Sequence, residues 1–439
     1  MSEPGAPLVG TVLELDVGAV AQGGSCVARH GGRVVFVRHA LPGERVRAVV
    51  TEDRRASFLR ADAVEILHAS ADRVRPPCPY AGPGRCGGCD WQHATADAQR
   101  RFKAAVIRDQ FARLGGIDLG DLLREVEPLP GGLLGWRTRV AYAVDADGRP
   151  GLRRHASHDV EHVDACLLGV AGVGDSPVLA GSWPGCNGVE VVRGDDGALT
   201  ELTHRPAVPK RHRGRRAHGR RAPDRVAVHA GPLRVRHDVG SRRFEVSAAG
   251  FWQVHPAAAA IYTHAVIDAL ATAGPLAGAK VLELYAGAGA LTAALAEAVG
   301  AGGLVTGVEL DPGAVEDAAA NLADLPQATV RQGKVSAAAV AELGAGDGVD
   351  LVVLDPPRTG AGPHVMAALA ALRPRAMAYL SCDAGTLARD VAAAREAGWN
   401  LTALRAFDAF PMTAHVECLA LLRPGGAAAE SSDTADLAS

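Results

Sequence analysis

The strongest constraint on the fold is a regular alternation of apolar strands and helical segments that begins near residue 276. Strands are predicted at 280–284, 304–310, 349–354, 376–380 and 416–422. Helical segments are predicted between them at 291–299, 312–322, 363–372 and 384–397. Because apolar strands separated by helices form mostly parallel sheets, we predict a doubly wound α/β sheet for this part of the chain.

The first of these strands runs into a small-residue loop that contains Gly287 and Gly289. Such glycines let the backbone approach a ligand closely. Glu309 ends the next strand, where a carboxylate can accept hydrogen bonds from both ribose hydroxyls. Thr292 stands where a dinucleotide-binding loop would have its third glycine. The loop therefore fits a nucleoside ligand without pyrophosphate, such as S-adenosylmethionine, better than a dinucleotide.

Two polar segments follow later strands at the same carboxyl edge, where ligands bind in open α/β sheets. In the first, Asp355 is followed by Pro356-Pro357-Arg358, and the two prolines hold the backbone rigid. In the second, Cys382 precedes Asp383, which is predicted to begin a helix. A thiol near a helix N-terminus has a lowered pKa and is a better nucleophile. The alternatives are an ordinary turn for the first segment and an inert, buried cysteine for the second.

Glu417 opens the last predicted strand. If that strand runs antiparallel to the others, its first residues lie at the same edge, where a carboxylate can take a proton from substrate. Cys418 would then point to the opposite face and belong to the core.

Three of the eight cysteines, Cys78, Cys86 and Cys89, fall within twelve positions, and Cys166 lies much further along. Eight cysteines in 439 residues are too few for a disulfide scaffold, so the group indicates metal or redox chemistry. Zinc ribbons usually carry two C-x2-C pairs. Three clustered thiols with a distant fourth favour a [4Fe–4S] cluster, with zinc as the alternative.

The remaining segments bear on binding partners. Residues 8–67 contain short strands with Gly-rich turns and many arginines, which predicts a small barrel with either a solvated surface or a nucleic-acid platform. From Arg205 to Arg225 there are nine Lys or Arg and one acid. That run is predicted to be a solvated insertion, with a phosphate-contacting arm as the alternative. We find no secretory signal and no membrane-spanning apolar run, so we expect a cytoplasmic protein with no membrane partner.

Taken together, the residues resemble the RNA m5U methyltransferase family, the uracil-C5 methyltransferases of the TrmA/RumA type. The N-terminal barrel resembles a TRAM domain, an OB-like RNA-binding module. The stretch C-G-G-C-D-W-Q-H at 86–93 is similar to the family's iron–sulfur segment, and F-W-Q-V at 251–254 is similar to its F-x-Q-V. The chain departs from the family pattern at Ala290 and His255, where an Asn is usual, and in the longer spacing between Cys78 and Cys86.

The resemblance implies a class I S-adenosylmethionine-dependent, Rossmann-like catalytic domain. It implies Cys382 as nucleophile and Glu417 as general base. It also implies a cofactor site at Gln253, Tyr285, Glu309 and Asp355, and a [4Fe–4S] cluster on Cys78, Cys86, Cys89 and Cys166.

The same resemblance suggests a TRAM barrel over 1–69, a central iron–sulfur domain over 70–235, the catalytic domain over 236–424 and a disordered tail over 425–439. The expected reaction is methylation of uridine at C5 in RNA, with 23S rRNA favoured over tRNA and a monomer favoured. Two rivals remain open: a nucleobase amino-methyltransferase that uses the D-P-P-R loop, and a catalytically inactive RNA-binding iron–sulfur protein.

Overall fold

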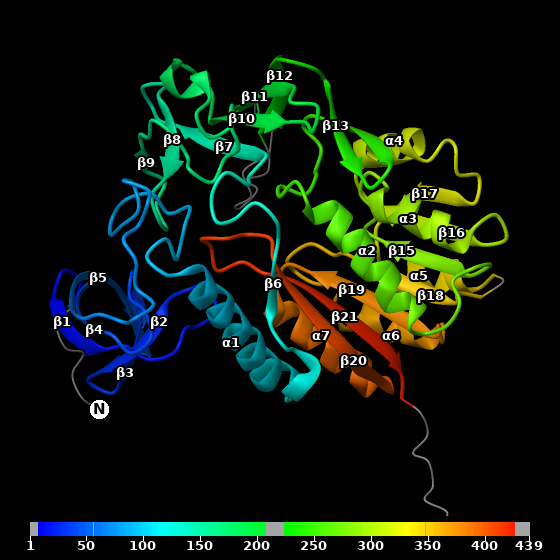
Figure 1. Ribbon diagram of the computed structural model, residues 1–439, viewed down its shortest axis with the longest axis horizontal. Coiled ribbons are helices and arrows are strands. Elements are labelled where there is room, and N and C mark those ends of the chain that lie inside the picture. The colour runs from blue at the N-terminus through cyan, green and yellow to red at the C-terminus, as the bar shows by residue number, and fades with distance from the viewer. Residues whose placement is uncertain (1–7, 56, 208–223, 347, 426–439) are drawn as a thin grey trace, which may run out of the picture.

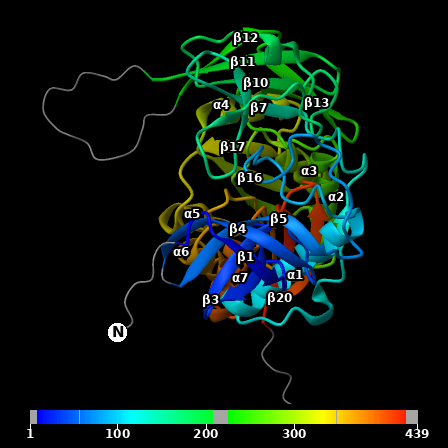
Figure 2. The same cartoon turned by 90° about the vertical axis from the view of Figure 1, so that its left-hand side faces the viewer.

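The computed structural model describes residues 8–55, 57–207, 224–346 and 348–425. In this part of the chain, a small barrel, a six-stranded sheet and a large α/β layer lie side by side (Figure 1). Figure 2 shows the barrel below the six-stranded sheet. Most of the basic run, 208–223, and all but the first residue of the predicted disordered tail lie outside the described residues.

The N-terminal unit is the barrel that the sequence predicts. Its strand order is β1-β4-β5-β3-β2, and the two edge strands β1 and β2 also contact each other, which closes the sheet. Alternate residues of β1, Leu13 and Leu15, point into its core. The strands are β1 (Val12–Asp16), β2 (Cys26–His30), β3 (Arg33–Arg38), β4 (Arg45–Arg55) and β5 (Phe58–His68).

The six-stranded sheet has its own small apolar core, which includes Val140, Tyr142 and Val189. Its order is β12-β11-β10-β7-β8-β9, and a separate hairpin, β13-β14, follows it in the chain. The strands are β7 (Arg139–Val144), β8 (Pro150–Arg153), β9 (Val160–Glu161), β10 (Gly188–Arg193), β11 (Leu199–Arg205), β12 (Arg225–Ala230), β13 (Arg234–Val239) and β14 (Arg242–Ser247).

The C-terminal layer is the predicted doubly wound sheet, with the order β17-β16-β15-β18-β19-β21-β20-β6. The strand β21 is antiparallel to both of its neighbours, which places its first residue, Glu417, at the carboxyl edge of the parallel strands. The strands are β6 (Val126–Pro128), β15 (Lys280–Leu284), β16 (Leu304–Glu309), β17 (Ala328–Gln332), β18 (Leu351–Leu354), β19 (Ala376–Ser381), β20 (Trp399–Asp408) and β21 (Glu417–Pro424).

Helices cover both faces of this sheet. The first face carries α1 (Ala96–Gly115), α5 (Ala337–Gly344), α6 (Pro363–Ala371) and α7 (Ala384–Glu396). The other carries α2 (Ala258–Ala271), α3 (Ala290–Val299) and α4 (Pro312–Asn321). None of the described helices is long and apolar enough to cross a membrane.

The range 70–235 contributes to all three units, since Trp91 and Phe102 pack in the core of the barrel. Its helix α1 packs along α7, with Ile107 and Phe111 buried in the core of the α/β layer, and its short strand β6 pairs in parallel with β20. Thr95 caps the start of α1, and Gly116 ends it in the left-handed region at φ 59°. The helix α1 therefore packs on both the α/β layer and the barrel, and only the later part of the range forms the six-stranded sheet.

A buried ion pair joins α1 to the end of β20. The Lys103 ammonium contacts the Asp408 carboxylate and donates to the Phe410 carbonyl at 3.0 Å, and both charged side chains are at most 2% exposed. Replacing Lys103 by Met leaves Asp408 charged and buried without its partner. We expect the free energy of unfolding to fall by about 3–5 kcal/mol, measured by urea denaturation. The double variant Lys103→Met/Asp408→Leu should recover most of the loss, and an equal loss in both variants would contradict this assignment.

Candidate active site

The carboxyl ends of β15, β16, β18 and β19 meet at one edge of the sheet. At the end of β15 the chain turns sharply into α3 through Gly287 and Gly289, at φ 55° and 88°. Tyr285 precedes this turn with φ 66°, a conformation that is uncommon for a side chain larger than glycine. Its N–H donates to the Val308 carbonyl at 2.8 Å. The backbone strain therefore sits where a ligand would approach the sheet.

The Glu309 carboxylate is fixed at this turn by three backbone donors. Gly287 donates to Oε2 at 2.9 Å, and Leu310 and Asp311 donate to Oε1 at 2.6 and 2.8 Å. An ionised carboxylate has about four lone-pair directions, so this one retains capacity for a further donor such as a ribose hydroxyl.

A thiol and two carboxyl groups lie together at the neighbouring strand ends. In the β19–β21 ladder Ser381 pairs with Cys418, which brings Cys382 next to Glu417. Glu417 is only 4% exposed. Its pKa is raised well above the usual range by burial and by the nearby Asp355 charge. Burial also raises the pKa of Asp355. Two carboxyl groups so placed resist carrying two charges at once, so one of them holds a proton readily.

The electrostatics of Cys382 differ from the sequence-based expectation. Burial, followed by the charge of Glu417, raises the pKa of the thiol to about 11, although Arg358 opposes the shift. The sequence-based expectation of a lowered pKa is therefore wrong, because burial and Glu417 raise it. Asp383 caps α7 and accepts the Thr386 N–H at 2.8 Å. The cap places a carboxylate at the positive end of the helix.

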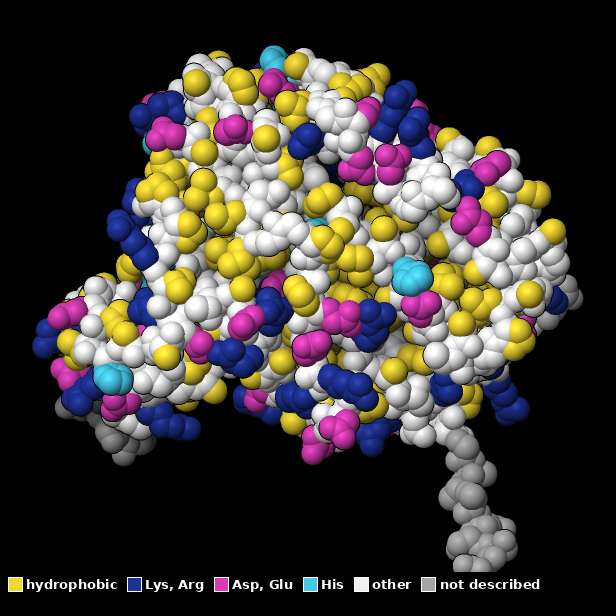
Figure 3. All heavy atoms as spheres, viewed as in Figure 1, with side chains coloured by type: hydrophobic (Ala, Val, Ile, Leu, Met, Phe, Trp, Pro, Cys, Tyr) yellow, Lys and Arg dark blue, Asp and Glu magenta, His cyan; other side chains and the backbone are white. Residues whose placement is uncertain are grey.

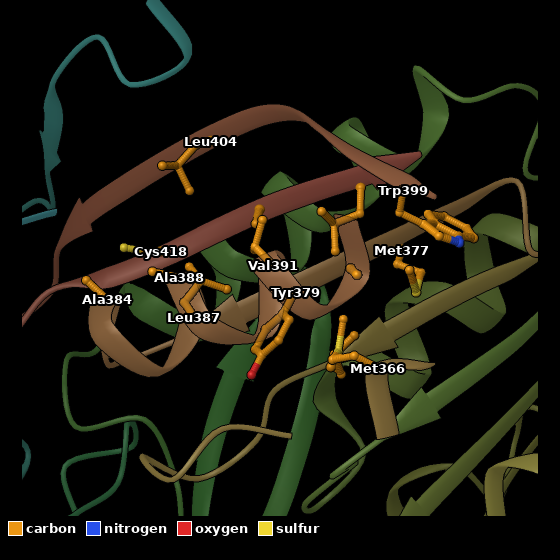
Figure 4. Packing of buried hydrophobic residues seen from close by; sticks show 14 of the residues in the cluster. Met366, Met377, Tyr379, Ala384, Leu387, Ala388, Val391, Trp399, Leu404 and Cys418 are labelled. Atoms are coloured by element: carbon orange, nitrogen blue, oxygen red, sulfur yellow. The ribbon is translucent and has the colours of Figure 1, made fainter. Parts of the chain in front are cut away.

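Cys418 lies in the core, as its alternation predicts. Its side chain is fully buried and packs in the cluster that contains Ala384 and Ala388 of α7 (Figure 4). The two neighbouring cysteines therefore have separate environments, with Cys382 at the strand edge and Cys418 beneath it.

The four cysteines predicted as cluster ligands line one cavity of about 130 Å³. Burial raises the pKa of Cys89 to about 12, and also raises the pKa of Cys86 and Cys166. Among the described residues, no three His, Cys, Asp or Glu side chains form a group that could hold a metal ion. The cavity thus gathers Cys78, Cys86, Cys89 and Cys166, but the predicted iron–sulfur domain is not established by it.

The residues that follow Cys89 hold the loop that leads to Glu417. The N–H groups of Asp90 and Trp91 donate to the Met412 carbonyl at 2.9 and 3.0 Å. In return, the Ala414 N–H donates to Asp90 Oδ2 at 2.9 Å. The position of the carboxyl group at the reactive edge therefore depends on the segment that also carries the clustered cysteines.

Comparison with known proteins places this architecture in a family. A TRAM domain model matches residues 7–64, and a model described as tRNA (Uracil-5-)-methyltransferase matches residues 219–424. A Streptomyces coelicolor protein described as an uncharacterized RNA methyltransferase is 46% identical, over 97% of this chain and 95% of its own length. The chain belongs to the RNA m5U methyltransferase family.

Other relatives of this methyltransferase agree. The 23S rRNA (uracil(1939)-C(5))-methyltransferase RlmD of Chromohalobacter salexigens is 34% identical, over 93% of this chain and 88% of its own. The crystal structure of Pyrococcus abyssi tRNA (uracil-54, C5)-methyltransferase, in complex with S-adenosyl-L-homocysteine, has the same fold. Its TM-score is 0.67 at 20% identity, covering 93% of this chain and 99% of that one. The fold is a class I methyltransferase with an N-terminal TRAM domain, and the chain is an RNA (uracil-5-)-methyltransferase.

The F-W-Q-V segment of the methyltransferase lies in the loop before α2. Gln253 is half-buried there, and the carbonyl of Val254 accepts the Thr138 N–H at 2.8 Å. His255, which departs from the family pattern, is 1% exposed and stacks on Trp136 with ring centroids 5.9 Å apart. Its role in this chain is therefore core packing.

Two buried groups at the edge escaped the sequence analysis. Glu283 is fully enclosed in β15, where burial raises its pKa to about 8, and its Oε2 has no hydrogen-bond partner among the described residues. A single acid in an apolar strand was the signal that could have found it. Tyr262 on α2 gave no signal, because aromatic residues on a helix face are ordinary core.

The Tyr262 hydroxyl is buried without a hydrogen-bond partner in the described chain. Its ring packs on Phe407, with centroids 5.6 Å apart, and Phe407 pairs with Glu417 across the β20–β21 ladder. Burial and then the charges of Glu417 and Asp355 raise the pKa of the phenol. A buried hydroxyl is thus held at the reactive edge with no protein partner.

For Tyr262→Phe we expect opposite changes in stability and rate. Removing an unsatisfied hydroxyl should raise the free energy of unfolding by about 1 kcal/mol, measured by urea denaturation. The methylation rate should fall about tenfold, because the variant removes an unpaired hydrogen-bond donor that lies near Glu417 and Asp355. An unchanged rate with the higher stability would show that the hydroxyl is merely tolerated.

Proposed function

We propose that this enzyme methylates C5 of a uridine in RNA with S-adenosylmethionine as methyl donor, through a covalent adduct of Cys382. The observation that supports it best is the meeting of a thiol and two buried carboxyl groups at one edge of the sheet, beside the Glu309 turn. A uracil C5 is a poor nucleophile, so the reaction needs all of these groups together.

In this proposal the cofactor site is formed by Gln253, Tyr285, Glu309 and Asp355. The Glu309 carboxylate accepts a hydrogen bond from a ribose hydroxyl, using a lone pair that its three backbone donors leave free. The glycine turn lets the cofactor approach the end of β15. The S-adenosyl-L-homocysteine in the Pyrococcus abyssi enzyme supports a ligand of this class. The cofactor supplies an electrophilic methyl group on a sulfonium.

The steps follow from the chemistry of the base. The Cys382 thiol gives its proton to solvent, and the sulfur adds to C6 of uracil and converts the ring to an enolate, in which C5 is electron-rich. C5 then takes the methyl group, and the sulfonium becomes a neutral thioether. Glu417 removes the remaining C5 proton as general base, and elimination breaks the bond between C6 and sulfur. The uridine must leave its stack to reach the thiol, which single-stranded loops make less costly.

The proposed mechanism predicts a shifted pH profile for Asp355→Asn. Glu417 must be ionised to accept the C5 proton, so kcat should rise with pH through its raised pKa. The negative charge of Asp355 raises the pKa of both Glu417 and Cys382. Removing that charge should therefore lower both pKa values. We expect the ascending limb of kcat to move to lower pH by about one unit, measured at saturating RNA and cofactor.

The control is Glu316→Gln, which removes an exposed carboxylate on α4 and should leave the limb in place. If the ascending part of the kcat–pH profile of Asp355→Asn is unchanged or moves to higher pH, the role given to the carboxyl pair is wrong.

For the substrate, we favour 23S rRNA over tRNA. The support is the C. salexigens relative, which is similar over most of both chains and is named as an rRNA enzyme. The test is methyl transfer to purified 23S rRNA and to tRNA, followed by nucleoside analysis. Appearance of 5-methyluridine in 23S rRNA alone is the expected result, and its appearance in tRNA alone would establish the alternative substrate. A product methylated on an amino group would instead support the D-P-P-R rival.

We also propose that Cys78, Cys86, Cys89 and Cys166 hold a [4Fe–4S] cluster, with zinc as the alternative. Four thiols around one cavity match the donor set of a cluster, whose irons and sulfides spread the ligands further apart than a single metal ion does. The cluster would tie the segment around Cys89 to Cys166 and so support the Asp90–Met412 contacts. Iron and sulfide analysis of anaerobically purified protein tests the assignment.

A further inference from the structure

A second and larger cavity lies on the six-stranded sheet, apart from the residues of the candidate active site. Its volume is about 530 Å³, within the range of small-ligand sites. We call it the sheet groove. Its lining includes three small residues on the strands, Ala141, Ala143 and Gly188. The arginine, histidine and aspartate residues of the lining are Arg153, Arg154, His155, His204 and Asp224.

Part of the floor of the sheet groove is lined by small side chains, beside the His204–Glu190 pair, whose members lie opposite Gly188 and Ala141 in the strand ladders. Gly188 pairs with Ala143 across the β7–β10 ladder, and Ala141 lies two residues away on the same face of β7. Two alanines and a glycine on adjacent strands leave the surface of the sheet open. A flat aromatic ring system such as a nucleobase could lie against it.

The rim carries a free positive charge. Arg154 pairs with Glu161 at 3.0 Å, and His204 contacts Glu190 at 3.0 Å. Arg153 is exposed, and its only side-chain contacts in the described chain are with His158. Its guanidinium is therefore free to bind a phosphate.

Charges on the barrel also act on the lining of the groove. Burial, and then the charges of Arg38 and Arg60 on the barrel, lower the pKa of His155 to about 4. Arg60 lies over the rings of Phe36 and Phe58, at 5.7 and 5.5 Å from their centroids. Stacked aromatic and guanidinium groups of this kind bind unpaired nucleotides. Lys and Arg side chains recur along the left edge in Figure 3, where the barrel and the six-stranded sheet approach each other.

We propose that the sheet groove binds an unpaired nucleotide of the substrate RNA, with its base on the small-residue floor and its phosphate at Arg153. The inference rests on the proposed function for its ligand and adds a second contact site away from the reacting uridine. Gly88, Ala141 and Leu152 line both this groove and the cysteine cavity. RNA held here would therefore contact the segment that positions the loop before Glu417.

The test measures binding of a fluorescent RNA to Arg153→Glu in the full-length protein. The probe is an unmodified RNA fragment that contains the target uridine. We expect the Kd to rise about tenfold and the slope of log Kd against log salt to fall by about one. S-adenosylmethionine binding and kcat at saturating RNA should not change. The Kd of Arg153→Lys for this RNA should stay close to the wild-type value. The matched control is Arg113→Glu, which reverses an arginine that is 74% exposed on α1, and it should leave the Kd unchanged.

Ultraviolet cross-linking of the same RNA, with mapping of the modified peptides, provides a second readout. We expect cross-links within 141–157, and cross-links confined to the barrel and the catalytic edge would overturn the proposal. An unchanged Kd in Arg153→Glu would overturn it as well. Because both readouts follow binding, they remain decisive even if the wild-type protein binds the RNA without methylating it, which would refute the proposed function instead.

Discussion

Replacing Cys382 by Ala is expected to abolish methylation of RNA while S-adenosylmethionine still binds with its normal Kd. Without the sulfur, C6 receives no nucleophile and C5 never becomes electron-rich enough to take the methyl group. Loss of a covalent nucleophile typically lowers kcat by about 10⁴-fold or more. The measurement is single-turnover methyl transfer, with cofactor binding followed by calorimetry.

The neighbouring Cys418→Ala is the matched control. Cys418 follows Glu417 on β21 and pairs with Ser381, the residue before Cys382, but its thiol is buried in the core. This variant should lose some stability and keep its kcat. If Cys382→Ala retained turnover, the covalent mechanism would be wrong. Equal losses of kcat in both variants, with normal folding, would point to a packing effect.

Glu417→Gln is expected to stop the reaction after methyl transfer and to accumulate RNA bound covalently to the enzyme. Glutamine keeps the size of the side chain but cannot take the C5 proton, so elimination of Cys382 is blocked. Loss of a general base lowers turnover by about 10²–10⁴-fold. The adduct should appear as a protein band of reduced mobility in denaturing gels with labelled RNA.

This band must depend on Cys382. The double variant Cys382→Ala/Glu417→Gln should show none, and added S-adenosylmethionine should be required for the methylated form. Rapid release of methylated RNA from Glu417→Gln would argue that another group removes the proton. Asp355, which shares the edge with Glu417, would then be the next candidate.

Much of the catalytic layer could be predicted because its signals are local. The apolar strand 280–284 and the helix after it follow directly from the sequence pattern, and β15 matches the predicted strand. The position of Glu417 followed from one condition, an antiparallel last strand, which the structure meets. By contrast, the three-residue strand β6 is too short to give a pattern, and its pairing with β20 joins residues far apart in the chain.

The electrostatics could not be predicted, because they depend on packing. A cysteine before a helix suggests a lowered pKa, but burial of Cys382 and then the nearby charge of Glu417 raise it. Tyr262 is another example, since only the folded chain brings its hydroxyl to the carboxyl pair. The raised pKa of Cys382 and the position of the Tyr262 hydroxyl both depend on side chains from different helices and strands that meet at the carboxyl edge of the sheet.

The most direct test of the account is release of tritium from RNA that carries [5-³H]uracil. The anaerobically purified protein is incubated with this RNA and S-adenosylmethionine, and tritium is counted in water. Substitution at C5 must expel the original hydrogen, so we expect release that depends on the cofactor and is lost in Cys382→Ala. Methyl transfer to the same RNA without tritium release would contradict C5 methylation.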